Sequence, residues 1–156
     1  MFRNTLDKLI AIREDKKAED GGFTLIELLV VVVIIGVLIA IAIPLYLNYE
    51  KGAADKSAQS DLRAAVSTLS QCYSENSNAY PAVPTGGADA TGSLQFTCGT
   101  TTETAKLSSG THLKYAQGTS SASFTLAAWN TNGHKNADSA GNEYTYDSTA
   151  GGTIGG

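Results

Sequence analysis

The sequence has few of the residues that build catalytic or metal centres. It contains two histidines and two cysteines in 156 residues, and these show none of the spacings typical of metal ligands. It has no glycine-rich phosphate loop, no nucleophile elbow and no HExxH motif. These absences leave no case for catalysis, and we expect no enzyme activity, no cofactor and no metal.

The sequence also has no excess of basic residues. Its formal net charge is −4. Residues 1–22 contain five basic and five acidic residues, so the remainder, with six basic and ten acidic, carries the whole net charge. Nucleic-acid-binding domains usually have a basic surplus. The charge therefore gives no support to a nucleic-acid partner, and we expect the lysines to lie on a solvated surface.

Charge is absent over the 22 residues from Leu28 to Tyr49. A helix crosses a bilayer with about 20 apolar residues, so this run is long enough to span a membrane. A secretory signal peptide has a shorter apolar core with small residues after it, whereas Gly21 and Gly22 come before this one. A cut after Gly22 would leave the apolar run at the N-terminus of the mature chain.

An amphipathic pattern follows the apolar run and predicts that the helix continues to about Ser74. The apolar positions, spaced by three and four, are Ala54, Ala58, Leu62, Ala65, Val66, Leu69 and Tyr73. The opposite, solvent-facing side is predicted to contain Lys51, Asp55, Gln59 and Arg63. One helix is thus expected from near Thr24, with weak points at Gly36 and Pro44.

Beyond the helix, short runs alternate with turn signals and predict an antiparallel sheet covered on one side by the helix. The predicted strands are 93–97, 112–117, 123–129 and 143–147. Residues 99–110 are interpreted as a turn-rich connection, and the tail 149–156 as flexible. The fold class is therefore α+β, with a long N-terminal helix packed on a small antiparallel sheet.

Cys72 and Cys98 lie in the part that a membrane segment would place outside the cytoplasm, where disulfides persist. Because the chain has only these two cysteines, their pairing is forced if both are oxidised. We favour the disulfide, and two free buried thiols are the alternative.

The most specific segment is GFTLIELLV at residues 22–30, which continues through Gly36 to Pro44. It resembles the N-terminal region of type IV prepilins and type II secretion pseudopilins, and the resemblance extends to residue 48. The matching features are Gly22 before the cut, Phe23 after it, Glu27 as the fifth mature residue and Pro44 as the twenty-second.

The resemblance implies that a prepilin peptidase cuts between Gly22 and Phe23 and methylates the new amine. It implies that Glu27 pairs with the N-terminal ammonium of a neighbouring subunit's Phe23 during assembly. An interfacial carboxylate that reaches water or lipid headgroups is the alternative. It also implies a helix that melts locally between Gly36 and Pro44 in the filament, for which a simple proline kink is the alternative.

The resemblance further implies three parts: a cleaved leader (1–22), a transmembrane and filament-core helix (23–49), and a head with the rest of the helix (50–156). The chain would be a single-pass precursor in the bacterial cytoplasmic membrane and then the major subunit of a homo-oligomeric extracellular pilus for adhesion, motility or DNA uptake. Its partners would be the peptidase, an assembly ATPase and an inner-membrane platform protein. The alternatives are a pseudopilin that acts in protein export and a membrane-anchored binding protein that never polymerises.

Some features depart from the family or stay open. The leader is long and has no net side-chain charge, and the cysteines lie early in the chain. Asp138, Asn142, Glu143 and Asp147 offer oxygen ligands for Ca²⁺, but a solvated acidic loop is the favoured interpretation. Tyr46 and Tyr49 suit either an interfacial aromatic belt or a filament core.

Overall fold

The computed structural model describes residues 22–82, 89–150, 152, 154 and 155 of the chain. Its contacts divide the chain into two compact units, residues 1–44 and 45–156, which are described separately. The predicted leader lies outside the described residues, except for Gly22.

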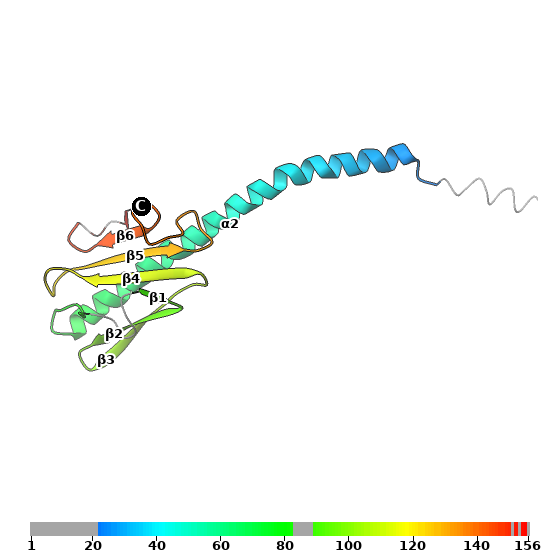
Figure 1. The fold of residues 1–156 in the computed structure, drawn as a ribbon. Coiled ribbons are helices and arrows are strands. Elements are labelled where there is room, and N and C mark those ends of the chain that lie inside the picture. The colour runs from blue at the N-terminus through cyan, green and yellow to red at the C-terminus, as the bar shows by residue number, and fades with distance from the viewer. Residues whose placement is uncertain (1–21, 83–88, 151, 153, 156) are drawn as a thin grey trace, which may run out of the picture. The chain divides into compact units, whose positions relative to one another are not determined.

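Helix α2, Leu25–Glu75, is 51 residues long and confirms the predicted helix (Figure 1). It contains Pro44 in its interior, and every residue from Phe23 to Glu50 is exposed. Among the described residues, α2 is the helix that is long and apolar enough to cross a membrane, with a mean hydropathy of 3.3 in its apolar window, none of which is buried.

The strands form two antiparallel sheets, where the sequence predicted one. The larger sheet has the strand order β1-β4-β5-β6-β7, and β2 pairs with β3 in the smaller. The strands are β1 (Asp89–Thr91), β2 (Ser93–Cys98), β3 (Thr101–Lys106), β4 (Thr111–Gln117), β5 (Phe124–Asn130), β6 (Tyr144–Asp147) and β7 (Ile154–Gly155).

The four predicted strands are confirmed to within one residue at each end, as β2, β4, β5 and β6. Two other expectations were wrong. The segment 99–110 was interpreted as a connection but contains β3, and the tail, expected to be flexible, contains β7. The β-branched threonines of β3 suit a strand, and the two-residue turn at Gly99, which has a positive φ of 63°, closes its hairpin with β2.

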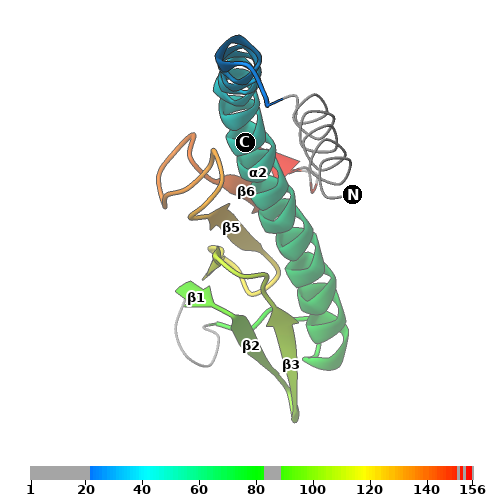
Figure 2. The ribbon, with the colours of Figure 1, turned by 90° about the vertical axis from the view of Figure 1, so that its right-hand side faces the viewer.

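Within residues 45–156, α2 lies against one face of the strands (Figure 2). Strand β2 alternates exposed and buried residues, and β4 buries every second residue. The helix contributes Ala58, Leu62, Ala65, Leu69 and Cys72 to the core, and the strands contribute Leu94, Phe96, Leu113, Tyr115, Phe124, Leu126 and Ala128. The predicted apolar face of the helix is thus the buried one at its central positions, while Ala54, Val66 and Tyr73 are half-buried.

One residue of the predicted solvent face is placed differently. Asp55 is buried, with 8% exposed, because its carboxylate is bound by the loop that follows β5. Asp61 is equally buried, and its carboxylate accepts hydrogen bonds from the Ser108 amide (2.7 Å) and hydroxyl (3.1 Å). Both aspartates compensate their burial by binding loops of the head.

Candidate functional site: the N-terminal segment and its attachment to the head

The predicted cleavage point lies before the helix, in a stretch that is open to solvent. Gly22, Phe23 and Thr24 have no regular structure and are exposed, with Phe23 84% accessible. A Cβ added at Gly22 would meet nothing within 4 Å. The described part of the chain therefore does not shield the Gly22–Phe23 peptide bond from a protease.

The first turn of α2 contains a capping box formed by Thr24 and Glu27. The Glu27 amide donates to Thr24 Oγ1 (3.3 Å), and Glu27 Oε2 accepts from the Thr24 amide (2.9 Å) and hydroxyl (2.8 Å). This reciprocal arrangement satisfies amides that a helix start leaves free. The sequence analysis did not identify Thr24, although a T-x-x-E spacing ahead of an apolar run is a recognised signal for this box.

The capping box gives Glu27 a hydrogen-bond partner inside its own subunit. A carboxylate in an apolar segment is costly unless it is hydrogen-bonded. The Thr24 hydroxyl and amide therefore lower the cost of holding Glu27 near a membrane before any neighbouring subunit arrives. A cation brought by a neighbour would then add to these bonds or replace them.

Gly36 and Pro44 both lie within the continuous helix α2. Neither side of Gly36 is crowded, since an added Cβ would meet nothing within 4 Å. Pro44 lacks the amide hydrogen that an interior helical residue donates. Local melting between these residues concerns the assembled filament and stays a prediction.

The end of α2 is covalently joined to the head. Cys72 and Cys98 form the expected disulfide, with a Cα–Cα distance of 5.0 Å, and both residues are buried. Close by, the Thr101 hydroxyl donates to Glu75 Oε2 (2.7 Å). The turn at Gly99 approaches so closely that a Cβ there would lie 3.2 Å from the Glu75 carbonyl oxygen. The helix end and the β2–β3 hairpin therefore form one unit.

Three of the four residues considered for Ca²⁺, namely Asp138, Glu143 and Asp147, line one pocket, but each is in a different environment. Asp138 pairs with Lys114 at 2.7 Å, which holds the pKa of Asp138 below its usual value. Burial, reinforced by the charge of Asp138, raises the pKa of Glu143. Hydrogen bonds from Thr149 lower the pKa of Asp147. The described residues contain no group of three or more His, Cys, Asp or Glu side chains placed to hold a metal ion.

Comparison with known proteins identifies the N-terminal segment. The family model of the prokaryotic N-terminal methylation motif matches residues 18–43. The chain carries the prokaryotic N-terminal methylation motif. The predicted resemblance is confirmed, and the motif includes the predicted cleavage point, the capping box and Gly36.

Three curated proteins are similar in sequence to this chain. The type IV major pilin protein PilA of Myxococcus xanthus is 43% identical over 54 residues, which are 35% of this chain and 24% of the relative. The type II secretion system core protein G is 35% identical in Pseudomonas aeruginosa and 34% in Aeromonas hydrophila, each over 71 residues. These 71 residues are 46% of this chain and 49% of each relative, so the chain spans at most about half of the relatives that it matches. No solved structure matches the chain significantly.

The methylation motif covers the start of a helix that is long and apolar enough to cross a membrane, which fits a bacterial inner-membrane precursor. The relatives have structural or secretion roles by name, and they include both a pilin and a secretion-system protein. The relatives therefore do not distinguish a pilin from a secretion-system pseudopilin.

Proposed function

We propose that the chain is a structural subunit, the major pilin, of a type IV pilus-like extracellular filament that serves adhesion, motility or DNA uptake. The observation that supports this most strongly is the exposed Gly22–Phe23 junction, followed by Glu27 and an exposed apolar helix half. All 20 large hydrophobic residues found exposed among the described residues lie between Phe23 and Tyr49. A patch of this size needs a membrane or another protein to cover it.

Processing prepares this segment for assembly. Residues 1–22 form the leader, a prepilin peptidase removes it after Gly22, and the amine of Phe23 is methylated. Residues 23–49 hold the precursor in the membrane and later form the filament core, while residues 50–156 form the head. A cytoplasmic ATPase and an inner-membrane platform protein drive extension of the homo-oligomer.

Assembly in one register follows from the charge of Glu27. The carboxylate pairs with the Phe23 ammonium of a neighbouring subunit, and any other register leaves a charge unpaired in apolar surroundings. The apolar side chains between them supply the area buried in the helical bundle.

Incubation of the full chain with a prepilin peptidase tests the processing step. Intact-mass measurement should show a product that begins at Phe23, and Gly22→Val should block its formation because the added β-branched side chain restricts the backbone there. Cleavage elsewhere, or none in the wild-type chain, would contradict the proposal.

A pseudopilin of a type II secretion system is the second candidate. It is favoured by the two core protein G relatives, whose similarity extends over more residues than that of PilA. Deletion of the gene separates the two roles. Loss of surface filaments with normal secretion supports the pilin, and loss of secreted enzymes supports the pseudopilin.

A further inference from the structure

The loop between β5 and β6, residues 131–143, forms a groove with α2 at the end of the apolar run. The groove has a volume of about 330 Å³ and is lined by Leu47, Glu50, Lys51, Thr131, Asn132, Gly133 and Asn136. All of these residues belong to the compact unit 45–156. Because Leu47 is part of the uncharged run, the loop reaches back to the level at which that run ends.

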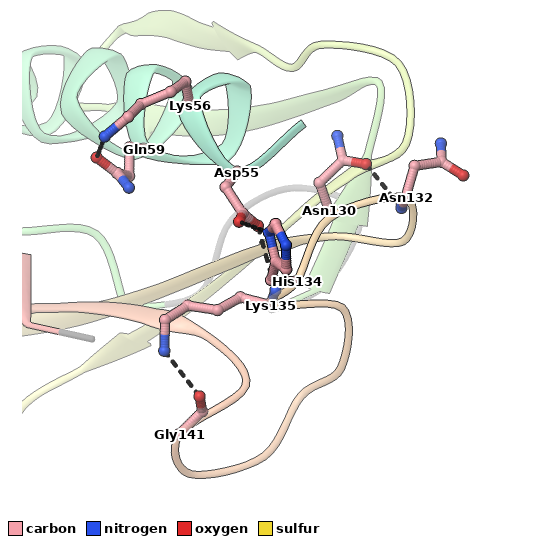
Figure 3. Close-up of polar contacts among 8 residues, drawn as sticks. All are labelled: Asp55, Lys56, Gln59, Asn130, Asn132, His134, Lys135 and Gly141. Atoms are coloured by element: carbon pink, nitrogen blue, oxygen red, sulfur yellow. Dashed lines mark hydrogen bonds and ion pairs between the residues drawn. The ribbon is translucent and has the colours of Figure 1, made fainter. Parts of the chain in front are cut away.

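The loop is held in this position by Asp55 of the helix. Asp55 Oδ1 accepts from the Lys135 amide (3.1 Å), and Oδ2 lies 2.8 Å from His134 Nδ1 (Figure 3). Gly133 packs so closely that a Cβ there would lie 2.3 Å from Asp55 Oδ1. The approach of loop to helix is therefore built into the fold and depends on a glycine.

Asn130, at the end of β5, fixes the first part of the loop. Its side-chain amide donates to the Ser109 carbonyl (3.0 Å), and its Oδ1 accepts from the Asn132 amide (3.0 Å). Its own carbonyl accepts from the Gly133 amide (2.8 Å). These bonds order the backbone and leave the Asn132 side chain for other contacts.

The groove lies at the level of lipid headgroups when the apolar run crosses a membrane. The 22 residues Leu28–Tyr49 are about 33 Å long as a helix, against about 30 Å of hydrocarbon. Their last turn and Lys51 therefore lie in the polar layer. Tyr46 and Tyr49, exposed by 65% and 72%, are of the residue type that marks this boundary.

The polar side chains around the groove are unengaged within the part of the chain that the structure describes. No hydrogen bond or ion pair there involves the side chains of Glu50, Lys51, Asn132 or Asn136. Lys51 supplies a cation and the two asparagines supply N–H donors, which suits a phosphate. Glu50 supplies an acceptor, which suits an ammonium group.

We propose that this groove binds the headgroup of a zwitterionic phospholipid, and so seats the head of the unassembled precursor on the membrane surface. The phosphate is taken by Lys51 with Asn132 and Asn136, and the primary ammonium by Glu50. The inference rests on the proposed function insofar as the helix must cross a membrane before assembly. It adds a lipid partner to the precursor stage of that function.

The test uses the ¹⁵N-labelled full chain in phosphatidylethanolamine nanodiscs that contain a small fraction of lipid with a gadolinium-chelate headgroup. Paramagnetic relaxation of the backbone amides then reports closeness to the headgroups without altering the groove. The amides of Asn132 and Asn136 should relax strongly. The amide of Thr102 should not, because it lies beside the helix end, about 36 Å further along α2 than Lys51.

Two variants with the same charge change separate the groove from general attraction. Lys51→Ala should weaken loop contact with the headgroups about tenfold, because it removes a charge-assisted hydrogen bond to the phosphate. Lys56→Ala, whose ammonium lies outside the groove and bonds to Gln59, should leave the contact unchanged. Phosphatidylcholine, whose ammonium has no N–H, should also reduce the contact.

Equal relaxation at Asn136 and Thr102 overturns the proposal, as does a contact that Lys51→Ala leaves intact. The failure of the filament proposal is distinguishable from this one. If filaments form but the loop shows no closeness to the headgroups, only the lipid site is contradicted. If the loop contacts the headgroups but the chain is never cut after Gly22, only the filament role is contradicted.

Discussion

The two halves of α2 differ in what surrounds them. From Leu25 to Tyr49 the helix is apolar on all sides and entirely exposed, and its polar contacts lie in the capping box at its start. From Glu50 to Glu75 one face is buried, and Asp55, Asp61 and Cys72 bind separate parts of the head. The second half is thus covered by its own chain, whereas the apolar first half is left exposed.

The largest effect is expected from Glu27→Ala. Loss of the carboxylate removes the charge that we propose selects the register of assembly, so surface filaments should disappear from sheared fractions while the head stays folded. Glu103→Ala, which removes an acidic residue of the head, is the matched control and should assemble normally. Normal filaments from Glu27→Ala would favour a membrane-anchored protein that never polymerises.

Replacing both Cys72 and Cys98 by alanine tests the second half of the comparison. The chain-entropy model assigns about 3–4 kcal/mol to a disulfide that closes a loop of this size, since the two cysteines have a sequence separation of 26. Denaturant unfolding of the chain in detergent, followed by Trp129 fluorescence, should show this loss. Helix amides before Pro44 should keep their hydrogen-exchange rates, and a change there would show that the halves are coupled.

Asp55→Ala should destabilise the head by about 1 kcal/mol, because it leaves a partly buried amide without an acceptor. The affected amide is that of Lys135, and its hydrogen exchange should accelerate. Gln59→Ala, on the exposed side of the same helix, is expected to change neither quantity. Unaltered exchange at Lys135 in Asp55→Ala would contradict the anchoring role of the aspartate.

A smaller effect is expected at the start of the helix. Thr24→Ala removes the hydroxyl of the capping box and should cost about 1 kcal/mol of local stability, whereas Thr24→Ser should retain it. Hydrogen exchange at residues 25–28 of the chain in a membrane mimetic measures the fraying. Identical exchange in both variants would mean that neighbours or lipid, rather than Thr24, order this end.

The last prediction concerns the ionisation of Tyr115, which changes stability only at alkaline pH. Burial, together with the charge of Tyr80, raises the pKa of Tyr115 from 10.0 to about 12, and its hydroxyl donates to the Pro81 carbonyl. Since the folded state holds this proton more tightly, its stabilising effect is complete below pH 10 and is lost as pH rises toward 12. Ultraviolet absorbance measures the formation of tyrosinate as the pH rises. In Tyr115→Phe, the ionisation step at the highest pH should be missing.

Local patterns in the sequence were sufficient for much of this structure. The uncharged run, the helical spacing that continues to Leu69 and the alternation of tyrosines with polar residues in β6 each depend on neighbours in sequence, and all three gave correct elements. The disulfide could be predicted because the chain offers only one pairing. The prepilin segment could be predicted because Gly22, Phe23 and Glu27 occur together directly before that run.

The rest depends on contacts that local patterns do not contain. Asp55 occupies a position that looks solvent-facing, and its burial follows from partners 79 and 80 residues away. Strand β3 is rich in threonine and was mistaken for a connection because its core contribution is Ala105 alone. Thr24 was different, because its signal was present in the sequence and was overlooked.

The most direct test of the central claim is N-terminal sequencing and intact-mass measurement of filaments sheared from the cell surface. We predict an abundant chain that begins at N-methylated Phe23 and contains one disulfide. A chain cut at Phe23 but confined to membranes would favour the pseudopilin. An uncut chain that begins at Met1 would contradict the assignment as a filament subunit.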